Sequence, residues 1–317
     1  MAKKDLYLVT GGAGFIGSHI VEALLRRHRK VRIFDNLSSG LFSNIKKFKG
    51  DWDFVKGDLR READVRKAVR GAKHIFHLAA CRAVVRSVDN PMETNDVNVT
   101  GTLRLLIAAR DAKVKRVVST SSSSVYGNTQ KFPSQEDDKP LPQSPYAATK
   151  IMGEYYCRQF NALYGLSTVS LRYFNVFGPR QNPESIYSAV IPIFIDCIVK
   201  RKSPTIHWDG NQSRDFSYVD NVVEGNLLAM SAPNVSGEVF NIACHEEYSV
   251  LDIWNSLCKI LNARGLKPVF KPKRPGDVRR SFADISKAKR LLGFKVQTRF
   301  YPGLVKTADW FLSAKKR

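Results

Sequence analysis

The chain has 317 residues, of which 43% are hydrophobic and 25% are charged, and it carries a net charge of +22. This composition excludes disordered and collagen-like proteins, and no run of 18 apolar residues exists, so we expect no membrane-spanning helix and no membrane partner. The basic residues are dispersed, without a basic arm or a nucleic-acid-binding motif. We therefore expect a solvated basic surface and no nucleic-acid partner, and the functional alternative is that this charge steers a polyanionic small substrate.

Short apolar runs alternate with longer helical patterns over the first 180 residues. This alternation predicts an α/β fold of the Rossmann type, in which a doubly wound parallel sheet carries helices on both faces. The expected strands are residues 6–9, 31–34, 54–55, 74–78, 116–121 and 168–172, and the expected helices are 15–27, 63–69, 91–109 and 146–164.

The pattern loosens after Gly178, where many prolines separate short elements. Such a change of pattern marks a second, smaller unit. We expect a nucleotide-binding domain over residues 1–174, to which 206–230 returns, and a smaller C-terminal α/β lobe that binds the substrate over 175–205 and 231–317.

A glycine-rich loop follows the first expected strand and begins the first expected helix. Residues 10–17 are Thr-Gly-Gly-Ala-Gly-Phe-Ile-Gly, which satisfies the G-x-G-x-x-G pattern between strand and helix. Glycines at these positions allow a tight turn and let backbone N–H groups approach a pyrophosphate at the helix N-terminus. The loop predicts a dinucleotide site.

Two acidic residues follow the next strands. Asp35 ends the second strand, 18 residues after Gly17, where a carboxylate accepts hydrogen bonds from the adenosine ribose and repels a 2′-phosphate. This favours NAD over NADP as the cofactor. Asp58 follows the third strand, where it contacts the adenine or caps a helix; the sequence leaves both readings open.

A tyrosine and a lysine four residues apart begin the helix expected at 146–164. Ser144 and Pro145 suit the N-cap and N1 positions, and the spacing places Tyr146 and Lys150 on one face. We expect the ammonium to lower the pKa of the phenol toward neutrality, as a general base requires. Serines at 119–124 end the fifth strand, where ligands of open α/β sheets bind, so a hydroxyl there would hold the substrate oxygen.

These motifs, with others along almost the whole chain, resemble the extended short-chain dehydrogenase/reductases. Within that family the chain is similar to nucleotide-sugar 4-epimerases, in the branch that acts on UDP-galactose and UDP-N-acetylglucosamine. The matching segments are TGGAGFIGSH at 10–19, DNLSSG at 35–40, GDLR at 57–60, HLAA at 77–80, NVTGT at 98–102, SSSSVYG at 121–127, SPYAATK at 144–150, LRYFNVFGPRQ at 171–181, SRDFSYVD at 213–220 and RPGDVRRSFADISKAKRLLG at 274–293.

The resemblance implies a role for each matching residue. Tyr146 would be the base, Lys150 would bind the nicotinamide ribose, and Ser122 would hydrogen-bond the reacting O4. Substrate contacts would come from Ser87, Ser122, Ser123, Tyr146, Asn175, Arg214, Arg274, Asp277 and Ser281. NAD contacts would come from Gly11, Gly14, Phe15, Ile16, Gly17, Asp35, Asn36, Ser38, Gly40, Asp58, Leu59, Leu78, Ala79, Ala80, Asn98, Tyr146, Lys150 and Tyr173.

The implied reaction inverts C4 of a UDP-hexose through a 4-keto intermediate, with no net redox change. Related dehydratases and decarboxylases resemble the chain but carry acidic residues where it has Ser123 and Ser124, which argues against both reactions. A UDP-glucuronate 4-epimerase stays open, as does a non-catalytic NAD-binding sensor or scaffold. In enzymes restricted to glucose and galactose a tyrosine occupies the position of Ser281, so the small serine implies that acetamido sugars are accepted.

The resemblance also suggests a homodimer formed through the helices expected at 91–109 and 146–164. Five cysteines occur without a C-x-x-C pair, which predicts reduced thiols, a cytoplasmic protein and no metal site.

Overall fold

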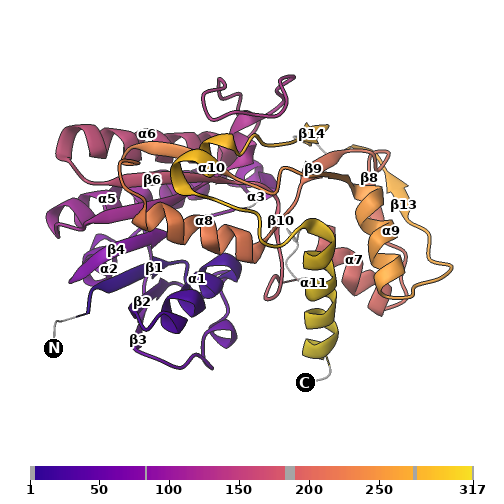
Figure 1. Ribbon diagram of the computed structural model, residues 1–317, viewed down its shortest axis with the longest axis horizontal. Helices are drawn as coiled ribbons and strands as arrows, with labels where there is room; N and C mark the ends of the chain where they lie inside the picture. The colour runs from indigo at the N-terminus through magenta and orange to yellow at the C-terminus, as the bar shows by residue number, and fades with distance from the viewer. Residues whose placement is uncertain (1–3, 83, 183–189, 274–276, 316–317) are drawn as a thin grey trace.

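A seven-stranded parallel sheet forms the centre of the protein (Figure 1). The structure, a computed structural model, describes residues 4–82, 84–182, 190–273 and 277–315. The strand order is β11-β6-β5-β4-β1-β2-β3, so the winding reverses between β1 and β4. This confirms the expected doubly wound α/β fold. The strands are β1 (Leu6–Thr10), β2 (Lys30–Asp35), β3 (Trp52–Lys56), β4 (Ala72–His77), β5 (Arg116–Ser122), β6 (Thr168–Tyr173) and β11 (Glu238–Ile242).

Helices cover both faces of the sheet because successive strand residues point to opposite sides. Val9 on β1 packs into a core that includes side chains of α1 and α8, whereas its neighbour Leu8 packs into a core with α2, α5 and α6. Burying each such aliphatic or aromatic side chain contributes about 1.5–3 kcal/mol. The helices are α1 (Phe15–Arg26), α2 (Glu62–Val69), α5 (Gly101–Asp111), α6 (Pro145–Tyr164) and α8 (Val219–Ser231).

The helix expected over 91–109 is interrupted. It consists of α4 (Pro91–Asn95), a π-helical turn at Asp96–Thr100 and then α5, and the short helix α3 (Val84–Asp89) precedes it. Single π turns inside helices often occur at functional sites. Here the turn carries Asn98, whose side chain reaches the loop after β4.

Small sheets and helices form the second lobe, on the right in Figure 1. The strand β9 (Ser213–Asp215) lies between β12 (Glu247–Ser249) and β14 (Arg280–Ser281), β8 (Thr205–His207) pairs with β13 (Val269–Lys271), and β7 (Val176–Phe177) pairs with β10 (Ser217–Tyr218). The helices are α7 (Val190–Val199), α9 (Val250–Ile260) and α11 (Phe300–Lys315). Helix α10 (Ser286–Leu292) instead packs against β11 and α8 at the main sheet. 3-10 turns occur at η1 (Phe42–Asn44) and η3 (Ser123–Tyr126).

The expected return of residues 206–230 to the first domain needs correction. Helix α8 does return and packs on the main sheet, but β8 and β9 belong to the small sheets of the second lobe. Strand β11, expected in the second lobe, pairs with β6 at the edge of the main sheet. The chain therefore crosses between the two lobes more often than the sequence pattern indicates.

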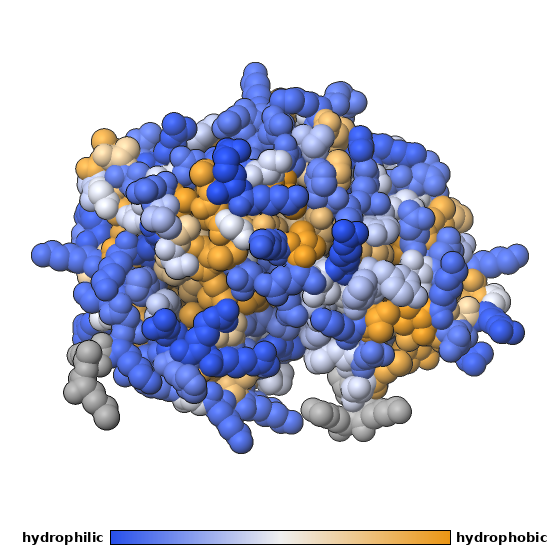
Figure 2. Space-filling model, viewed as in Figure 1, coloured by the Kyte–Doolittle hydropathy of each residue, from blue (hydrophilic) through white to orange (hydrophobic). Residues whose placement is uncertain are grey.

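The remaining expectations concern the surface, membrane-spanning helices, metal sites and cysteines. Hydrophilic side chains cover most of the face in Figure 2, with hydrophobic patches between them. None of the helices in the described part of the chain is long and apolar enough to cross a bilayer. Nor do the described residues contain a group of three or more histidine, cysteine or acidic side chains that could hold a metal ion. All five cysteines are free thiols.

Candidate active site

A cavity of ≈ 870 Å³ lies at the carboxyl ends of the central strands and extends to the second lobe. Parallel strands bring these ends to one edge of the sheet, which is why motifs far apart in sequence meet there. Among the predicted site residues, those that line the cavity are Gly11, Gly14, Phe15, Ile16, Gly17, Asp35, Asn36, Ser38, Gly40, Asp58, Leu59, Leu78, Ala79, Ala80, Ser122, Ser123, Tyr146, Lys150, Tyr173, Asn175, Arg214, Asp277 and Ser281.

The glycine loop between β1 and α1, called the glycine cradle below, packs so closely against neighbouring backbone that it has no room for side chains at Gly11 and Gly17. Gly11 has φ +68°, and a Cβ there would lie 2.8 Å from the backbone nitrogen of Ala79. A Cβ on Gly17 would overlap the carbonyl oxygen of Gly11. The backbone can therefore approach a ligand at the N-terminus of α1, where N–H groups favour a phosphate. These residues fit the diphosphate of a dinucleotide.

Asp35 ends β2 beside this cradle. Its carboxylate accepts hydrogen bonds from the backbone N–H groups of Ala13 (3.0 Å) and Leu37 (2.8 Å). Burial raises the pKa of Asp35, and the two N–H groups act in the opposite direction. The carboxylate therefore both shapes the loop and lines the cavity.

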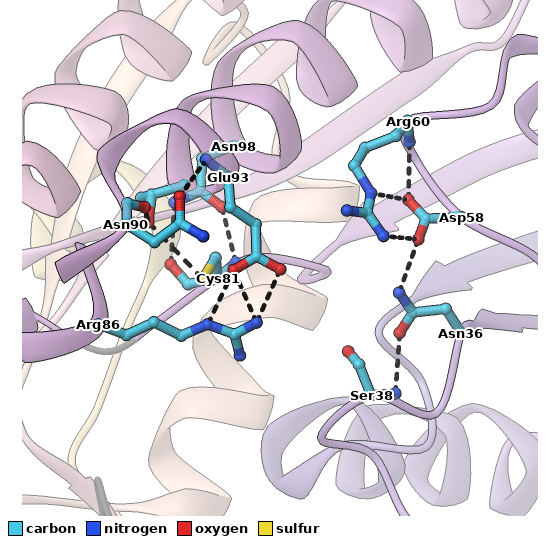
Figure 3. A network of polar contacts seen from close by, with 10 residues as sticks. Asn36, Ser38, Asp58, Arg60, Cys81, Arg86, Asn90, Glu93 and Asn98 are labelled. Atoms are coloured by element: carbon cyan, nitrogen blue, oxygen red, sulfur yellow. Dashed lines mark hydrogen bonds and ion pairs between the residues drawn. The ribbon is translucent and has the colours of Figure 1, made fainter.

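Asp58 and its partners form the neighbouring part of the wall (Figure 3). The Arg60 guanidinium donates to both carboxylate oxygens, at 3.0 and 2.7 Å, and Asn36 donates to one of them at 3.0 Å. Hydrogen bonds from Arg60 hold the pKa of Asp58 well below its usual range. The carboxylate also accepts the backbone N–H of Arg60 (2.9 Å), which forms a turn ahead of α2. The N-cap of α2 is Arg61, so Asp58 does not cap this helix, and its adenine contact stays a prediction.

Two predicted residues lie behind the cavity wall, and a third is outside the described residues. Asn98 accepts from the Cys81 N–H at 2.7 Å and donates to its carbonyl at 3.0 Å (Figure 3), so it holds the loop after β4 from behind. Ser87 is buried and donates to the carbonyl of Val84 at 2.6 Å, so its hydroxyl is used within α3. Arg274 falls in the segment that the structure does not describe.

The predicted catalytic residues meet between β5 and α6. Ser122 is the last residue of β5, and its Oγ accepts from the hydroxyl of Ser124 at 2.9 Å. The N-cap Ser144 accepts from the backbone N–H of Ala147 at 3.2 Å, which sets the start of α6. Tyr146 and Lys150 follow one turn apart, with the lysine Nζ 5.8 Å from the centre of the tyrosine ring.

The expected lowering of the pKa of Tyr146 by Lys150 is wrong for this structure. Burial raises the pKa of Tyr146, while hydrogen bonding to Ser122 and the charge of Arg82 act in the opposite direction. The Lys150 ammonium instead donates to the carbonyl of Thr120 at 3.0 Å. Burial also lowers the pKa of Lys150, to about 8. Desolvation, which the spacing of two residues does not reveal, is therefore the largest influence on the pKa of both side chains.

Cationic and polar side chains line the other end of the cavity. The Arg214 guanidinium donates to the carbonyl oxygens of Ser213 and Val278, both at 2.7 Å, which orient it without neutralising its charge. Asn175, with φ +32°, donates to the carbonyl of Asp215 at 3.0 Å. An oriented arginine of this kind suits a phosphate group.

Ser281 lies close to these side chains on β14, where it is in register with Arg214 on β9. It lines the cavity.

Sequence reasoning missed several other residues of the cavity wall. Position along the chain could have indicated two of them, because Arg82 is in the loop that follows β4 and Thr120 is near the carboxyl end of β5. The missed residues include Arg82, Thr120, Phe132, Gln181 and Arg280.

Comparisons with known proteins agree on one family. The model of the NAD dependent epimerase/dehydratase family matches residues 7–243. UDP-glucose 4-epimerase of Mycolicibacterium smegmatis is 39% identical over 96% of this chain and 97% of its own length. A solved UDP-N-acetylglucosamine 4-epimerase from Methanobrevibacter ruminantium, in complex with UDP-N-acetylmuramic acid, is 40% identical with a TM-score of 0.92, covering 99% of this chain and 100% of that chain. The UDP-glucose 4-epimerase of Thermus thermophilus, in complex with NAD, is 35% identical with a TM-score of 0.89, covering 98% and 99%.

We predict that Asp35→Ala weakens NAD binding about tenfold and narrows the preference for NAD over NADP. The variant loses a buried carboxylate that repels a 2′-phosphate and holds the glycine loop, and hydrogen bonds to a charged group contribute about 1.5–3 kcal/mol. The measurement is calorimetric titration of cofactor-free protein with each dinucleotide. The exposed Asp51→Ala is the matched control. Equal binding of NAD and NADP by the wild type would contradict the role given to Asp35.

Proposed function

The chain belongs to the NAD dependent epimerase/dehydratase family, and on that premise we propose that it is a UDP-sugar 4-epimerase that inverts C4 of a UDP-hexose. The observation that carries this proposal is the meeting of Ser122, Tyr146 and Lys150 in one cavity with the glycine cradle and Arg214. A sensor or scaffold would need the cradle but not the serine, tyrosine and lysine.

The cofactor is NAD, held by the glycine cradle, Asp35 and the loop that Asn98 supports. When bound, oxidised NAD supplies a positively charged nicotinamide that accepts the hydride from C4 and later returns it. The residues of the chain must then bind the sugar in two orientations, exclude water and move one proton.

Tyr146 takes the proton from O4 and later returns it. A neutral phenol cannot accept a proton, and burial favours the neutral form, so the base depends on cations near it. Arg82 supplies a positive charge that lowers the pKa of Tyr146. The Lys150 ammonium lies 5.8 Å from the centre of the tyrosine ring, and we propose that it adds a second positive charge once the phenol has lost its proton. Ser122 orients O4, because its hydroxyl is at the end of β5 and interacts with Tyr146.

The UDP half of the substrate is the fixed anchor. Arg214 and Asn175 hold the diphosphate through charge-assisted and amide hydrogen bonds, and Asp277 holds the uridine ribose. Arg274 adds a phosphate contact. The hexose must turn over between the two hydride transfers, so it is held more loosely than the diphosphate.

The substrates we propose are UDP-glucose and UDP-galactose together with their 2-acetamido counterparts. Ser281 leaves room in the wall for an acetamido group, whereas Ser123 and Ser124 offer no carboxylate for water elimination or decarboxylation. The test is incubation with UDP-glucose, UDP-N-acetylglucosamine and UDP-glucuronate in turn, with chromatographic detection of the C4 epimers. Turnover of UDP-glucuronate alone would replace this substrate assignment with a UDP-glucuronate 4-epimerase.

We propose that the chain forms a homodimer through the helical segments at 91–109 and 146–164. Large hydrophobic side chains are exposed on them, including Met92 (69%) and Leu163 (68%), and such faces often cover one another in dimers. We expect sedimentation equilibrium to give twice the chain mass and Leu163→Glu to give a monomer. A wild type that sediments as a monomer would contradict the dimer.

We predict that Tyr146→Phe lowers kcat by about 10²–10⁴-fold, the usual contribution of a general base, with little effect on NAD content. Phenylalanine keeps the ring but removes the ionisable oxygen. Epimerisation is measured by chromatography, and bound NAD is measured by its release on denaturation. The exposed Tyr301→Phe on α11 is the control. A Tyr146→Phe variant with more than half of the wild-type kcat would exclude Tyr146 as the base.

We predict that Ser281→Tyr loses epimerisation of UDP-N-acetylglucosamine at least about tenfold, corresponding to ~1.4 kcal/mol, and keeps activity on UDP-glucose. The phenol would occupy the arc through which the acetamido group turns, and overpacking a site typically costs about 1–3 kcal/mol. Ser281→Ala, which keeps the volume small, is the matched control. Equal loss of both activities in Ser281→Tyr would mean that Ser281 does not select the sugar.

A further inference from the structure

A buried ion pair lies behind the catalytic residues and has no part in the reaction described above. Glu154 follows Lys150 by one turn of α6, and Arg172 is on β6. The guanidinium donates to both carboxylate oxygens, from Nε at 2.9 Å and from a terminal nitrogen at 2.7 Å. The two side chains are only 4% and 6% exposed.

The rest of the network holds this pair in one position. Ser121, next to Ser122 on β5, donates its hydroxyl to Glu154. Arg172 also donates to the hydroxyl of Tyr126 and to the carbonyl of Glu136, both at 2.9 Å. Well-packed hydrophobic residues often replace buried ion pairs without loss of stability, so stability alone does not account for this one.

Glu154 and Lys150 face a common space. Positions i and i+4 lie on one side of a helix, and both residues line a small cavity of ≈ 10 Å³. Burial lowers the pKa of Lys150 to about 8, and the negative charge of Glu154 is the main influence that raises it, followed by Cys157. An opposite charge acts strongly at this depth, because little water screens it.

The other titratable groups near Lys150 do not offer a second fixed negative charge. His77 on β4 is buried with a pKa of about 3, so it is neutral, and burial raises the pKa of the Cys157 thiol to about 11. Tyr146 precedes Lys150 on α6, and burial raises the pKa of its phenol. Arg172 on β6 is a cation that Glu154 pairs.

We propose that Glu154 is a positioning residue of the active site, whose carboxylate keeps the Lys150 ammonium charged while Arg172 and Ser121 hold the carboxylate in place. The importance of this charge for catalysis rests on the proposed function, but the charge itself is measurable without a substrate. Glu154 acts through Lys150 and does not touch the reacting atoms.

The direction of the effect follows from the charges. The Lys150 ammonium is present below its pKa and is lost as the pH rises through it. Replacing Glu154 with a neutral side chain lowers that pKa further, so Lys150 becomes neutral at a lower pH. Tyr146 then loses one of its cations, and activity falls first on the alkaline side of the pH profile.

The experiment compares the NAD-loaded wild type with Glu154→Gln. Both are labelled with ¹³C at the ε-carbons of lysine, and the Lys150 resonance is identified by its absence in Lys150→Met. We expect the NMR titration midpoint of Lys150 to fall by about one pH unit or more in Glu154→Gln, as for removal of a nearby opposite charge. The alkaline limb of the kcat profile should move by a similar amount.

Two further variants keep the test decisive. Glu154→Gln leaves the buried charge of Arg172 without its anionic partner, so this single variant is prone to misfold. The double variant Glu154→Gln/Arg172→Met therefore removes the charge of Arg172 as well. Its Lys150 midpoint should stay below that of the wild type, because Arg172 is not among the charges that shift the pKa of Lys150. Glu136→Gln is the matched control, since Glu136 accepts from the backbone of Asn241 at 2.8 Å and faces Arg172 rather than Lys150.

An unchanged Lys150 midpoint in the folded single or double variant would overturn the proposal, and full activity of the double variant at pH 8 would show a purely structural role. A lowered midpoint in a protein whose wild type turns over no UDP-sugar would support the charge relation and refute the proposed function instead.

Discussion

The site depends on one geometric constraint, the alignment of parallel strands. All seven strands of the main sheet run in the same direction, so their carboxyl ends meet at one edge. The winding reverses between β1 and β4, which separates the helices and leaves a crevice at the glycine loop. Asp35 and Ser122 come to that crevice because each ends a strand. Loops that would otherwise be unrelated therefore build a single cavity.

Burial then decides the electrostatics of this cavity. Excluding water raises the pKa of Tyr146 and lowers that of Lys150, so both groups are driven toward their neutral forms. Catalysis by proton transfer requires the opposite, an anionic base beside a cation. The chain offsets this effect of burial with charged side chains that hydrogen bonds hold in place. Among the described residues, Glu154 and Arg172 form such a pair, and both are buried. An active site that excludes water needs such counter-charges in its surroundings as much as it needs the reacting groups.

The sequence predicted the parts of the site that local rules control. Glycine spacing, a strand-ending aspartate and the Tyr-x-x-x-Lys spacing each report a backbone conformation or a helix face, and the structure places all of them on the cavity. The residues that lie behind the cavity wall could not be predicted by such local rules. Asn98 lies in a π turn that changes the direction of its side chain, and no spacing rule indicates such a turn. The pairing of Glu154 with Arg172 joins a helix to a strand, so only the fold reveals it.

The two lobes divide the work of the site. The glycine cradle, Ser122 and the α6 residues belong to the first lobe, whereas Ser281 is on β14 of the second. A backbone bridge between Ser134 and Ala283 joins the loop before α6 to the segment that carries Ser281. Asn241 on β11 stabilises this junction, because it donates to the carbonyls of Ser134 and Asp284, both at 3.0 Å. The wall that carries Ser281 is therefore built on a different sheet from the strands that carry Ser122, and the junction at Ser134 holds the two parts together at one cavity.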